Sequence, residues 1–465
     1  TKVGRYAFAE TAISDFDFSA VKEIEPYAFA DCTGLESVWL NTNIGVIVGE
    51  GAFKGCRNVT RAALPDDMTI VPDKLFSGAA KLTEVSFNGF TVGVESFFDC
   101  RALTSFAHTG HLRMVKEGAF DGCVNLQSVD LSGVENFEKR AFGDCRSISE
   151  MYLFSVNSLA QSAFYGCSGV QRLSMPLFDN NLAYYFGETP SSLAVMEVLD
   201  DSVPDSAFSG AVSLVEVSLG NQATTIGNDA FAYCQNLQKL TLPDTVRSIG
   251  TGAFAGCSSL LSVDLPARIN KISDRMFADC TSLNEVVIGE KVTSIGDYAF
   301  TNCTSFQSFY MPDQVETIGF AAFSGCENLT YMKLPFVGYS ASDQTYIGYI
   351  FGADSFYGNA LPRKLNTIEL SNKCSAINYG AFMNCDTLGK IVLPQSLQTI
   401  YDNAFSGCTR LYDVVNDSAL GIACGSSDYG EVALYALRVH GSGEEVYGHN
   451  GVYDFLQGND GTWYL

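Results

Sequence analysis

Histidine and tryptophan are scarce in this sequence, which limits the chemistry that the chain can perform. It contains four histidines and two tryptophans among 465 residues. His108 and His111 stand three residues apart and could share a metal ion, but no cysteine or carboxylate stands at a spacing that completes four ligands. His440 and His449 lie in a polar segment near the end of the chain, where we expect a solvated loop. We therefore predict no catalytic residue, no metal site and no cofactor.

Positive charge and long apolar runs are also lacking. The chain has 28 basic against 52 acidic residues, which gives a formal net charge of −24. Such a surface repels nucleic acid and anionic membranes, so we expect no nucleic-acid partner. No apolar run approaches the roughly 18 residues of a membrane-spanning helix, so we expect no membrane insertion of these residues.

Several recognisable short motifs are missing as well. Neither a GxxxxGK[ST] phosphate-binding loop nor a GxSxG nucleophile motif occurs. The first residues, TKVGRYAF, have no initiator methionine, basic region or apolar stretch of a signal peptide. Val3, Gly4, Ala7 and Phe8 already fit the repeat described next, so we expect the sequence to begin inside a copy and to come from a longer protein.

The dominant positive feature is an internal repeat. The stretch 226–250, IGNDAFAYCQNLQKLTLPDTVRSIG, ends on the first two residues of the next copy, and isoleucine recurs every 23 residues through Ile318. Each copy has a phenylalanine five residues after the isoleucine, and a period of this length is typical of solenoids, propellers and arrays. The repeat phenylalanines mark 18 copies: Phe8, Phe29, Phe53, Phe76, Phe97, Phe120, Phe142, Phe164, Phe186, Phe208, Phe231, Phe254, Phe277, Phe300, Phe323, Phe351, Phe382 and Phe405.

Each copy contains the signals of one strand and one turn. The segment LxxVxLP alternates apolar and polar residues, so that Leu240 faces a core while Lys239 and Thr241 face water. The IGxxAFxxC segment predicts a second short extended piece followed by a single helical turn, which places phenylalanine and cysteine on the same side. We predict an α/β repeat solenoid over residues 1–416. It has a parallel sheet on one face and short turns, strands and single helical turns on the other.

Thirteen of the fifteen cysteines occupy one repeat position, three residues after the phenylalanine. Where the cysteine is missing, small apolar residues such as Ala79 and Ala211 replace it. This pattern indicates buried free thiols that are used for their size. Neighbouring repeats about 5 Å apart with parallel side chains also match disulfide geometry poorly.

Two copies and the C-terminal segment depart from the pattern. The copies of Phe186 and Phe351 lack the cysteine, and the usual spacing of 21–24 residues lengthens to 28 and 31 around Phe351, with an insertion at 336–365. Residues 417–465 no longer match the repeat. They predict a helix around 432–439 and a hairpin around 458–461, which together would cap the last repeat or begin a further module.

The outward positions of the predicted sheet hold the candidate binding residues. These are Trp39, Tyr152, Tyr310, Tyr331 and Lys333. Tyr310 and Tyr331 fall on adjacent strands and should touch, and exposed aromatic residues are enriched at binding hot spots. The alternative is that such aromatic pairs only stabilise the sheet.

The consensus IGxxAFxxCxxLxxVxLPxxVxxIG closely resembles the BspA-like class of leucine-rich repeat, from Val3 to about Val415. The resemblance implies a right-handed solenoid and a secreted or surface-displayed protein of mucosal bacteria or protozoan parasites, several of which are thought to be adhesins. It supplies no catalytic residue. We therefore expect a non-enzymatic protein at the cell surface or secreted from the cell. Through its strand face or the 336–365 loop it would bind a host extracellular-matrix or cell-surface protein. A display stalk for flanking domains is the alternative, and a carbohydrate-binding or enzyme accessory module is a third possibility.

Overall fold

Most repeats contribute two short extended segments, and each segment pairs in parallel with its equivalents in neighbouring repeats. The computed structural model describes residues 1–40, 44–108, 110, 112–342, 345–355, 357 and 360–443, and the backbone of 456–457 and 463–464. These residues form two compact units, which we describe separately. Unit 1 comprises Thr1–Val292 and Tyr298–Cys303, and unit 2 comprises Thr293–Asp297 and Thr304–Leu465.

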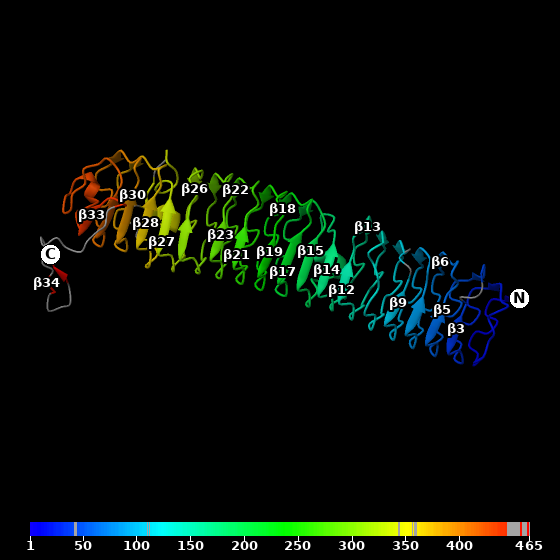
Figure 1. The fold of residues 1–465 in the computed structure, drawn as a ribbon. Coiled ribbons are helices and arrows are strands. Elements are labelled where there is room, and N and C mark those ends of the chain that lie inside the picture. Colours follow the sequence, from blue (N-terminus) through cyan, green and yellow to red (C-terminus); the bar gives the residue numbers. More distant parts are fainter. Residues whose placement is uncertain are drawn as a thin grey trace. The chain divides into compact units, whose positions relative to one another are not determined.

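The leucine-rich segments of unit 1 form strands of three or four residues whose side chains point alternately outward and inward, as their pattern predicts (Figure 1). They pair without a register shift, so equivalent repeat positions lie side by side; Val217, for example, lies opposite Leu240. The strands are β3 (Ser37–Trp39), β5 (Arg61–Ala63), β7 (Glu84–Ser86), β9 (Ser105–Ala107), β12 (Glu150–Tyr152), β14 (Arg172–Met175), β15 (Val195–Val198), β17 (Glu216–Leu219), β19 (Lys239–Thr241), β21 (Ser262–Asp264) and β23 (Glu285–Val287).

The residues that end on the repeat isoleucine form a second series of two-residue strands in unit 1. In most of them the inward residue is buried and the outward residue is more accessible, as in Ser248–Ile249. The series comprises β1 (Lys2–Val3), β2 (Glu23–Ile24), β4 (Ile47–Val48), β6 (Ile70–Val71), β8 (Thr91–Val92), β10 (Met114–Val115), β11 (Asn136–Phe137), β13 (Ser158–Leu159), β16 (Ser202–Val203), β18 (Thr225–Ile226), β20 (Ser248–Ile249) and β22 (Lys271–Ile272).

The AFxxC segment forms β-turns, and the helical turn expected there is wrong for copy 226–250. Asp229 and Tyr233 adopt left-handed conformations, with φ of 50° and 60°. The N–H groups of these two residues and of Phe231 between them donate to carbonyls of the next repeat, at 2.9 Å (Asp229), 2.8 Å (Phe231) and 2.6 Å (Tyr233). Alternate N–H groups are thus used between repeats, so they cannot close the bonds of a helix.

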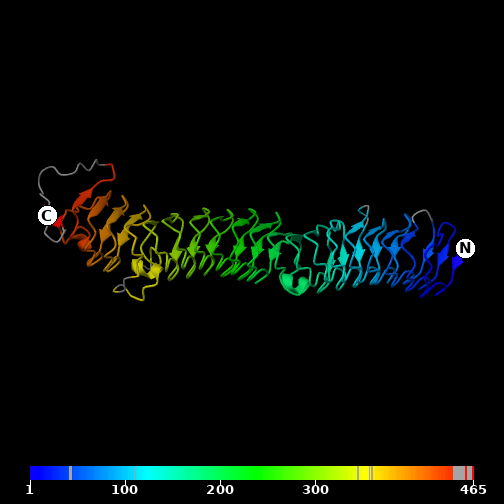
Figure 2. The same ribbon diagram turned by 90° about the horizontal axis from the view of Figure 1, so that it is seen from below.

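Short helices appear instead in the copies of Phe186 and Phe351, the two that depart most from the repeat. In unit 1 the helix α1 (Leu182–Phe186) begins after Asn181, whose side chain accepts a hydrogen bond from the Tyr184 N–H. It bulges out of the surrounding repeats of that unit (Figure 2). In unit 2 the 3₁₀-helix η1 (Ile347–Phe351) occupies the corresponding place inside the long insertion. Both helices still deliver a buried phenylalanine to the core.

Unit 2 continues both series of strands. The leucine-rich series forms a six-stranded sheet in the order β25-β27-β28-β30-β32-β33. The bounds of that sheet are β25 (Ser308–Tyr310), β27 (Tyr331–Leu334), β28 (Thr367–Leu370), β30 (Lys390–Leu393), β32 (Asp413–Asn416) and β33 (Arg438–His440). The short series comprises β24 (Ser294–Ile295), β26 (Thr317–Ile318), β29 (Ala376–Ile377) and β31 (Thr399–Ile400).

The C-terminal segment differs from the expected helix. A 3₁₀-helix of three residues, η2 (Tyr429–Glu431), is followed by turns, and Arg438–His440 then pairs in parallel with β32 as strand β33. The ladder therefore runs one strand beyond residue 416. Further along, β34 (Leu456–Gln457) and β35 (Trp463–Tyr464) pair antiparallel, as a hairpin does.

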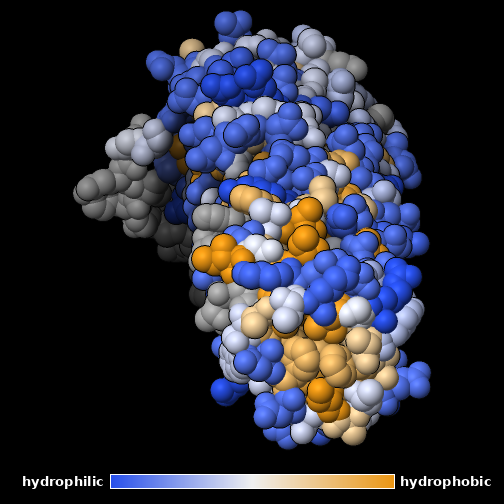
Figure 3. Space-filling view, turned by 90° about the vertical axis from the view of Figure 1, so that its right-hand side faces the viewer, coloured by the Kyte–Doolittle hydropathy of each residue, from blue (hydrophilic) through white to orange (hydrophobic). Residues whose placement is uncertain are grey.

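The repeat phenylalanines form the core as a stack of rings. Phe231, Phe254, Phe277 and Phe300 are fully buried, and successive centroids lie 5.6, 5.7 and 5.6 Å apart with the planes within 12° of parallel. At the N-terminal end of unit 1, Phe8 stacks on Phe29 and stays half-buried. Figure 3 looks at that end and shows apolar side chains gathered on part of it.

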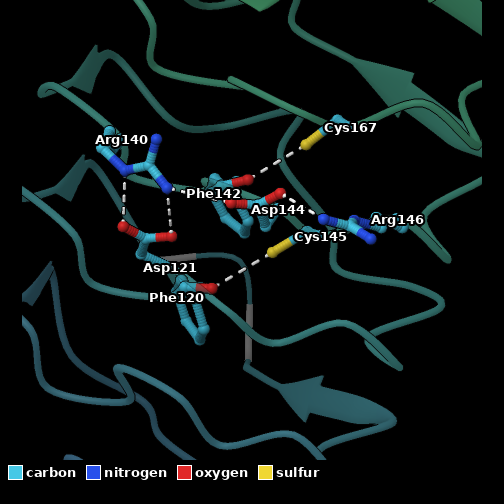
Figure 4. Close-up of polar contacts among 8 residues, drawn as sticks. All are labelled: Phe120, Asp121, Arg140, Phe142, Asp144, Cys145, Arg146 and Cys167. Carbon is cyan, nitrogen blue, oxygen red and sulfur yellow. Dashed lines mark hydrogen bonds and ion pairs between the residues drawn. The ribbon is translucent and has the colours of Figure 1, made fainter.

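The thirteen repeat cysteines are free and buried, which confirms the prediction made for them. Cys374 is also free and buried, and Cys424 is free and exposed. The thiols of the repeat cysteines also donate hydrogen bonds to backbone carbonyls, which the prediction that they only fill space did not include. Cys145 Sγ donates to the carbonyl of Phe120 at 3.2 Å, and Cys167 donates to that of Phe142 at 3.0 Å (Figure 4). Because the acceptor belongs to an earlier repeat, each such thiol adds a link between repeats.

Substitution of Phe277 by alanine should destabilise the protein by about 3–5 kcal/mol, because it leaves a cavity in the middle of the ring stack. Urea unfolding followed by circular dichroism measures this difference. Val287→Ala is the control, since Val287 is 49% exposed on the neighbouring strand β23 and its loss should change stability by less than about 0.5 kcal/mol. A loss below about 1 kcal/mol for Phe277→Ala would contradict a buried stack.

Only one thiol, that of Cys424, should react rapidly in the native protein, because it alone is exposed. Burial raises the pKa of the thiols of Cys56, Cys234 and Cys280 to about 12, so they carry no thiolate at pH 8. A thiol titration should find one fast group before unfolding and fifteen after it, and none before unfolding in Cys424→Ser. Fast native reaction of several repeat cysteines, or disulfides among them, would refute the packing account.

Candidate functional site

The outward residues of the six-stranded sheet in unit 2 form one continuous surface, which we call the unit-2 strand face. Its inward residues Met332, Ile368, Ile391 and Val414 are fully buried and fix which side chains point outward. Two outward rows run across the strands in register. The first row is Ser308, Tyr331, Thr367, Lys390, Asp413 and Arg438, and the second is Tyr310, Lys333, Glu369, Val392, Val415 and His440.

Three of the five predicted binding residues meet at one end of this face. Tyr310 and Tyr331 are in contact, with ring centroids 5.2 Å apart at 44°, which confirms the expected pair. Lys333 lies in register with Tyr310 and forms an ion pair with Glu369 at 2.7 Å. Glu369 also accepts a hydrogen bond of 2.6 Å from the Tyr331 hydroxyl. Tyr310 remains 64% exposed, so this anchored group presents a free aromatic ring.

Burial and hydrogen bonding fix the protonation states of Tyr331 and Glu369. Burial, followed by the hydrogen bond to Glu369, raises the pKa of the Tyr331 hydroxyl, so it stays a neutral donor. Burial also raises the pKa of Glu369, but the hydrogen bonds from Lys333 and Tyr331 outweigh burial and keep that pKa below its ordinary value. Near neutral pH the site therefore holds a carboxylate between an ammonium group and a phenol.

A second polar group lies at the other end of the face, around the buried carboxylate of Asp413. Arg438 binds both carboxylate oxygens, through Nε at 3.0 Å and Nη2 at 3.1 Å. Lys390 Nζ lies 3.3 Å from Oδ2, and His440 Nε2 lies 3.1 Å from Oδ1. Burial raises the pKa of Asp413, but the hydrogen bonds from Arg438 and His440 and the charge of Lys390 outweigh it, so the net shift is downward.

The other two predicted residues lie on unit 1 and in different sheets. Trp39 ends β3, is 51% exposed and borders a pocket of about 300 Å³ together with Asp15, Asp17 and Ser37. Tyr152 ends β12, stacks on Phe154 with centroids 5.9 Å apart and donates to Glu150 at 3.0 Å. The structure thus does not gather the five predicted residues into a single site.

A groove of about 370 Å³ lies beside α1, where the chain departs from the repeat. Its lining includes Arg146, Tyr165, Gly187 and Glu188. Figure 4 shows the ion-pair network next to it: Arg140 bridges the carboxylates of Asp121 and Asp144, and Arg146 pairs with Asp144 at 2.9 Å. Arg140 also lies over the Tyr165 ring, 4.9 Å from its centroid. Arg140 is thus held by two carboxylates and a ring, which lowers its value for ligand binding.

The residues considered for metal chemistry do not converge. Among the residues that the structure describes, no three histidine, cysteine or acidic side chains could hold a metal ion together. His108 Nε2 is 2.6 Å from the carbonyl of Asp130, whereas His111 and His449 lie outside the described residues. His440, expected in a solvated loop, is instead half-buried on β33. No helix in the described part of the chain is long and apolar enough to span a membrane.

Sequence reasoning missed Glu369, Asp413 and Arg438. Glu369 follows the long insertion, but the pattern Thr-Ile-Glu-Leu of β28 alternates as the other strands do and could have revealed it. Arg438 sits in the alternating stretch Arg-Val-His, which is too short to outweigh the helical spacing of the preceding residues. The interaction of Asp413 with three partners depends on register between distant segments, which no local pattern encodes.

Asp413→Asn should destabilise the protein at pH 7 by about 1–3 kcal/mol, because it removes the charged acceptor of several hydrogen bonds. The folded-state pKa of Asp413 is lowered, so this contribution is present above its unfolded pKa near 4 and is lost as pH falls through the folded value. Urea unfolding of wild type and variant between pH 7 and pH 3 should show the difference shrinking. The exposed Asp264 gives the control variant Asp264→Asn, and a pH-independent difference for Asp413→Asn would contradict the assignment.

Comparison with known proteins identifies the repeat. A model of the BspA type leucine rich repeat region matches residues 1–92, 90–189, 201–335 and 349–422. None of the curated proteins compared with the chain matches it.

Solved structures that resemble the chain are leucine-rich repeat proteins of low identity. One from Bacteroides ovatus is 21% identical, with 76% of this chain and 86% of that chain covered and a TM-score of 0.40. A leucine rich cell surface protein from Faecalibacterium prausnitzii is 20% identical, with coverage of 76% and 87% and a TM-score of 0.26. The pneumococcal vaccine antigen PcpA is 18% identical, with coverage of 72% and 80% and a TM-score of 0.25. Because the family model matches well over half of its residues, the chain belongs to the BspA-type leucine-rich repeat family.

Proposed function

We propose that this chain is a non-enzymatic protein-binding module of a cell-surface or secreted protein, and that it docks its partner on the unit-2 strand face. The observation that carries the proposal is the exposed ring of Tyr310, held in place by contact with Tyr331 beside the Lys333–Glu369 ion pair. A large aromatic side chain on a rigid support is the type of residue that dominates binding energy in protein interfaces.

The simpler explanation, that the tyrosines only stabilise the sheet, accounts for Tyr331 better than for Tyr310. Tyr331 is half-buried and hydrogen-bonded to Glu369, so its role within the fold is clear. Tyr310 is 64% exposed, and most of its ring contributes nothing to burial within unit 2. An exposed tyrosine on a pre-organised sheet loses little side-chain entropy when a partner covers it.

The class of partner follows from the family and the surface together. BspA-type repeats occur in surface proteins, and the strand face offers a firm, continuous surface, which suits a protein partner. We therefore propose a host extracellular-matrix or cell-surface protein as the partner, with adhesion as the biological role. Trp39 and Tyr152 are proposed as further contacts on the strand face of unit 1.

Tyr310→Ala and Tyr331→Ala should each weaken partner binding by about tenfold, as expected for hot-spot residues. Surface plasmon resonance against a panel of purified extracellular-matrix proteins measures the affinity. Tyr401→Ala is the matched control, because Tyr401 is 52% exposed in the same unit but lies off the strand face, after β31. Trp39→Ala and Tyr152→Ala then report whether the contact extends along unit 1.

Unchanged affinity in both unit-2 tyrosine variants would overturn the strand-face site. If the wild-type chain binds none of the matrix or cell-surface proteins offered, the adhesive role fails. The display stalk, in which flanking domains do the binding, would then be the better account.

A further inference from the structure

The unit-2 strand face carries more basic than acidic side chains, whereas the chain as a whole is strongly acidic. Along the outward strand positions of unit 1, acidic residues outnumber basic ones. The acidic residues there are Glu84, Glu150, Glu197, Glu216, Asp264 and Glu285, and the basic ones are Arg61, Arg172 and Lys239. On the unit-2 face the balance is reversed: Lys333, Lys390 and Arg438 face Glu369 and Asp413, with His440 beside them.

The surplus of positive charge is concentrated at β30 and β33. Glu369 neutralises Lys333, so that end of the face is balanced. At the other end one carboxylate, Asp413, serves both Lys390 and Arg438. The Asp413 side chain is 3% exposed, whereas those of Lys390 and Arg438 are 36% and 48% exposed. What the surface presents is therefore two cations above a buried anion.

The buried carboxylate also orients the cations. Asp413 holds Arg438 through Nε and Nη2, and within the described residues Nη1 has no partner. Lys390 has Asp413 as its single described partner, so two of its three N–H groups are unused. A guanidinium group fixed in this way can donate hydrogen bonds to a second carboxylate with little loss of side-chain freedom.

We infer that this end of the unit-2 strand face binds an acidic, carboxylate-bearing peptide segment of the partner protein. The inference rests on the proposed function, because it names the chemistry of the segment that docks beside the tyrosines. Six strands about 4.8 Å apart span about 24 Å, the length of roughly seven extended residues. One extended segment can thus place an apolar residue on Tyr310 and carboxylates on Lys390 and Arg438.

A short acidic peptide fits this site better than a long polyanion. Nucleic acids and sulfated glycans bind through many cations at once, and their affinity depends on how many charges are neutralised. The unit-2 strand face offers a surplus of one positive charge on a chain of net charge −24. A long polyanion would extend beyond the face and be repelled by the rest of the surface, whereas an acidic peptide of about six residues stays within the span of the unit-2 strand face.

The test uses the full chain and a fluorescein-labelled hexaglutamate peptide in a fluorescence anisotropy titration, with hexalysine and hexaglutamine as comparison peptides. Wild type should bind hexaglutamate but not hexaglutamine, and more weakly as salt is added. Any binding of hexalysine to the acidic remainder of the chain should be independent of Lys390 and Arg438. Lys390→Gln and Arg438→Gln should each weaken binding by about tenfold, the effect of losing one charged hydrogen bond. Lys239→Gln is the matched control, because Lys239 also pairs with a strand-face carboxylate, Glu216, but in unit 1.

The outcomes separate this inference from the proposed function. Tyr310→Ala should weaken binding of the whole partner more than binding of hexaglutamate. If hexaglutamate does not bind, or binds equally well to both glutamine variants, the inference is wrong even when the tyrosine variants still lose the partner. If heparin binds more tightly than hexaglutamate through the same two residues, the ligand is a polyanion and the peptide assignment falls. Circular dichroism confirms folding, and Lys390→Gln preserves the test if Arg438→Gln unfolds.

Discussion

The structure depends on the fact that no repeat can satisfy its own backbone. The short strands pair with those of neighbouring repeats. In the turn segment, alternate N–H groups also donate to the next repeat, at 2.9, 2.8 and 2.6 Å from Asp229, Phe231 and Tyr233. An unpaired buried N–H is costly, so successive repeats must match in register and spacing. The phenylalanine stack and the thiol contacts repeat at the same interval, because they are fixed to that backbone.

This constraint divides the sequence into positions that can vary and positions that cannot. The carbonyl of Phe231 accepts both the N–H of Cys234 and the thiol of Cys257, so the repeat cysteine is a donor as well as a filler of space. Outward strand positions neither fill the core nor have to bond to its backbone carbonyls. Tyr310 and Tyr331 can therefore differ from their counterparts Thr241 and Lys239 without disturbing the pairing of the strands, and residues that determine specificity can collect in those positions.

The sequence predicted the parts of the fold that one copy encodes by itself. Alternation revealed the strands, and the recurrence of phenylalanine and cysteine revealed the core. The turn conformation could not be predicted this way, because the left-handed Asp229 and Tyr233 donate their N–H groups to the next repeat, and a pattern within one copy does not encode bonds between copies. The Tyr310–Tyr331 contact was predictable from register, but the partner of Lys333 lay beyond a long insertion.

The strand β33 shows how closing a ladder and creating a binding site are linked. A final strand has to pair with β32 and yet leave its outer surface compatible with water, so its sequence favours long polar side chains. Arg438 and His440 meet that need by reaching back to Asp413, which buries their polar contact and leaves the rest of the guanidinium group facing outward. Because Lys390 converges on the same carboxylate, the closing strand adds positive charge where the sheet ends. The ligand chemistry of the unit-2 strand face thus follows from the way in which its last strand is stabilised.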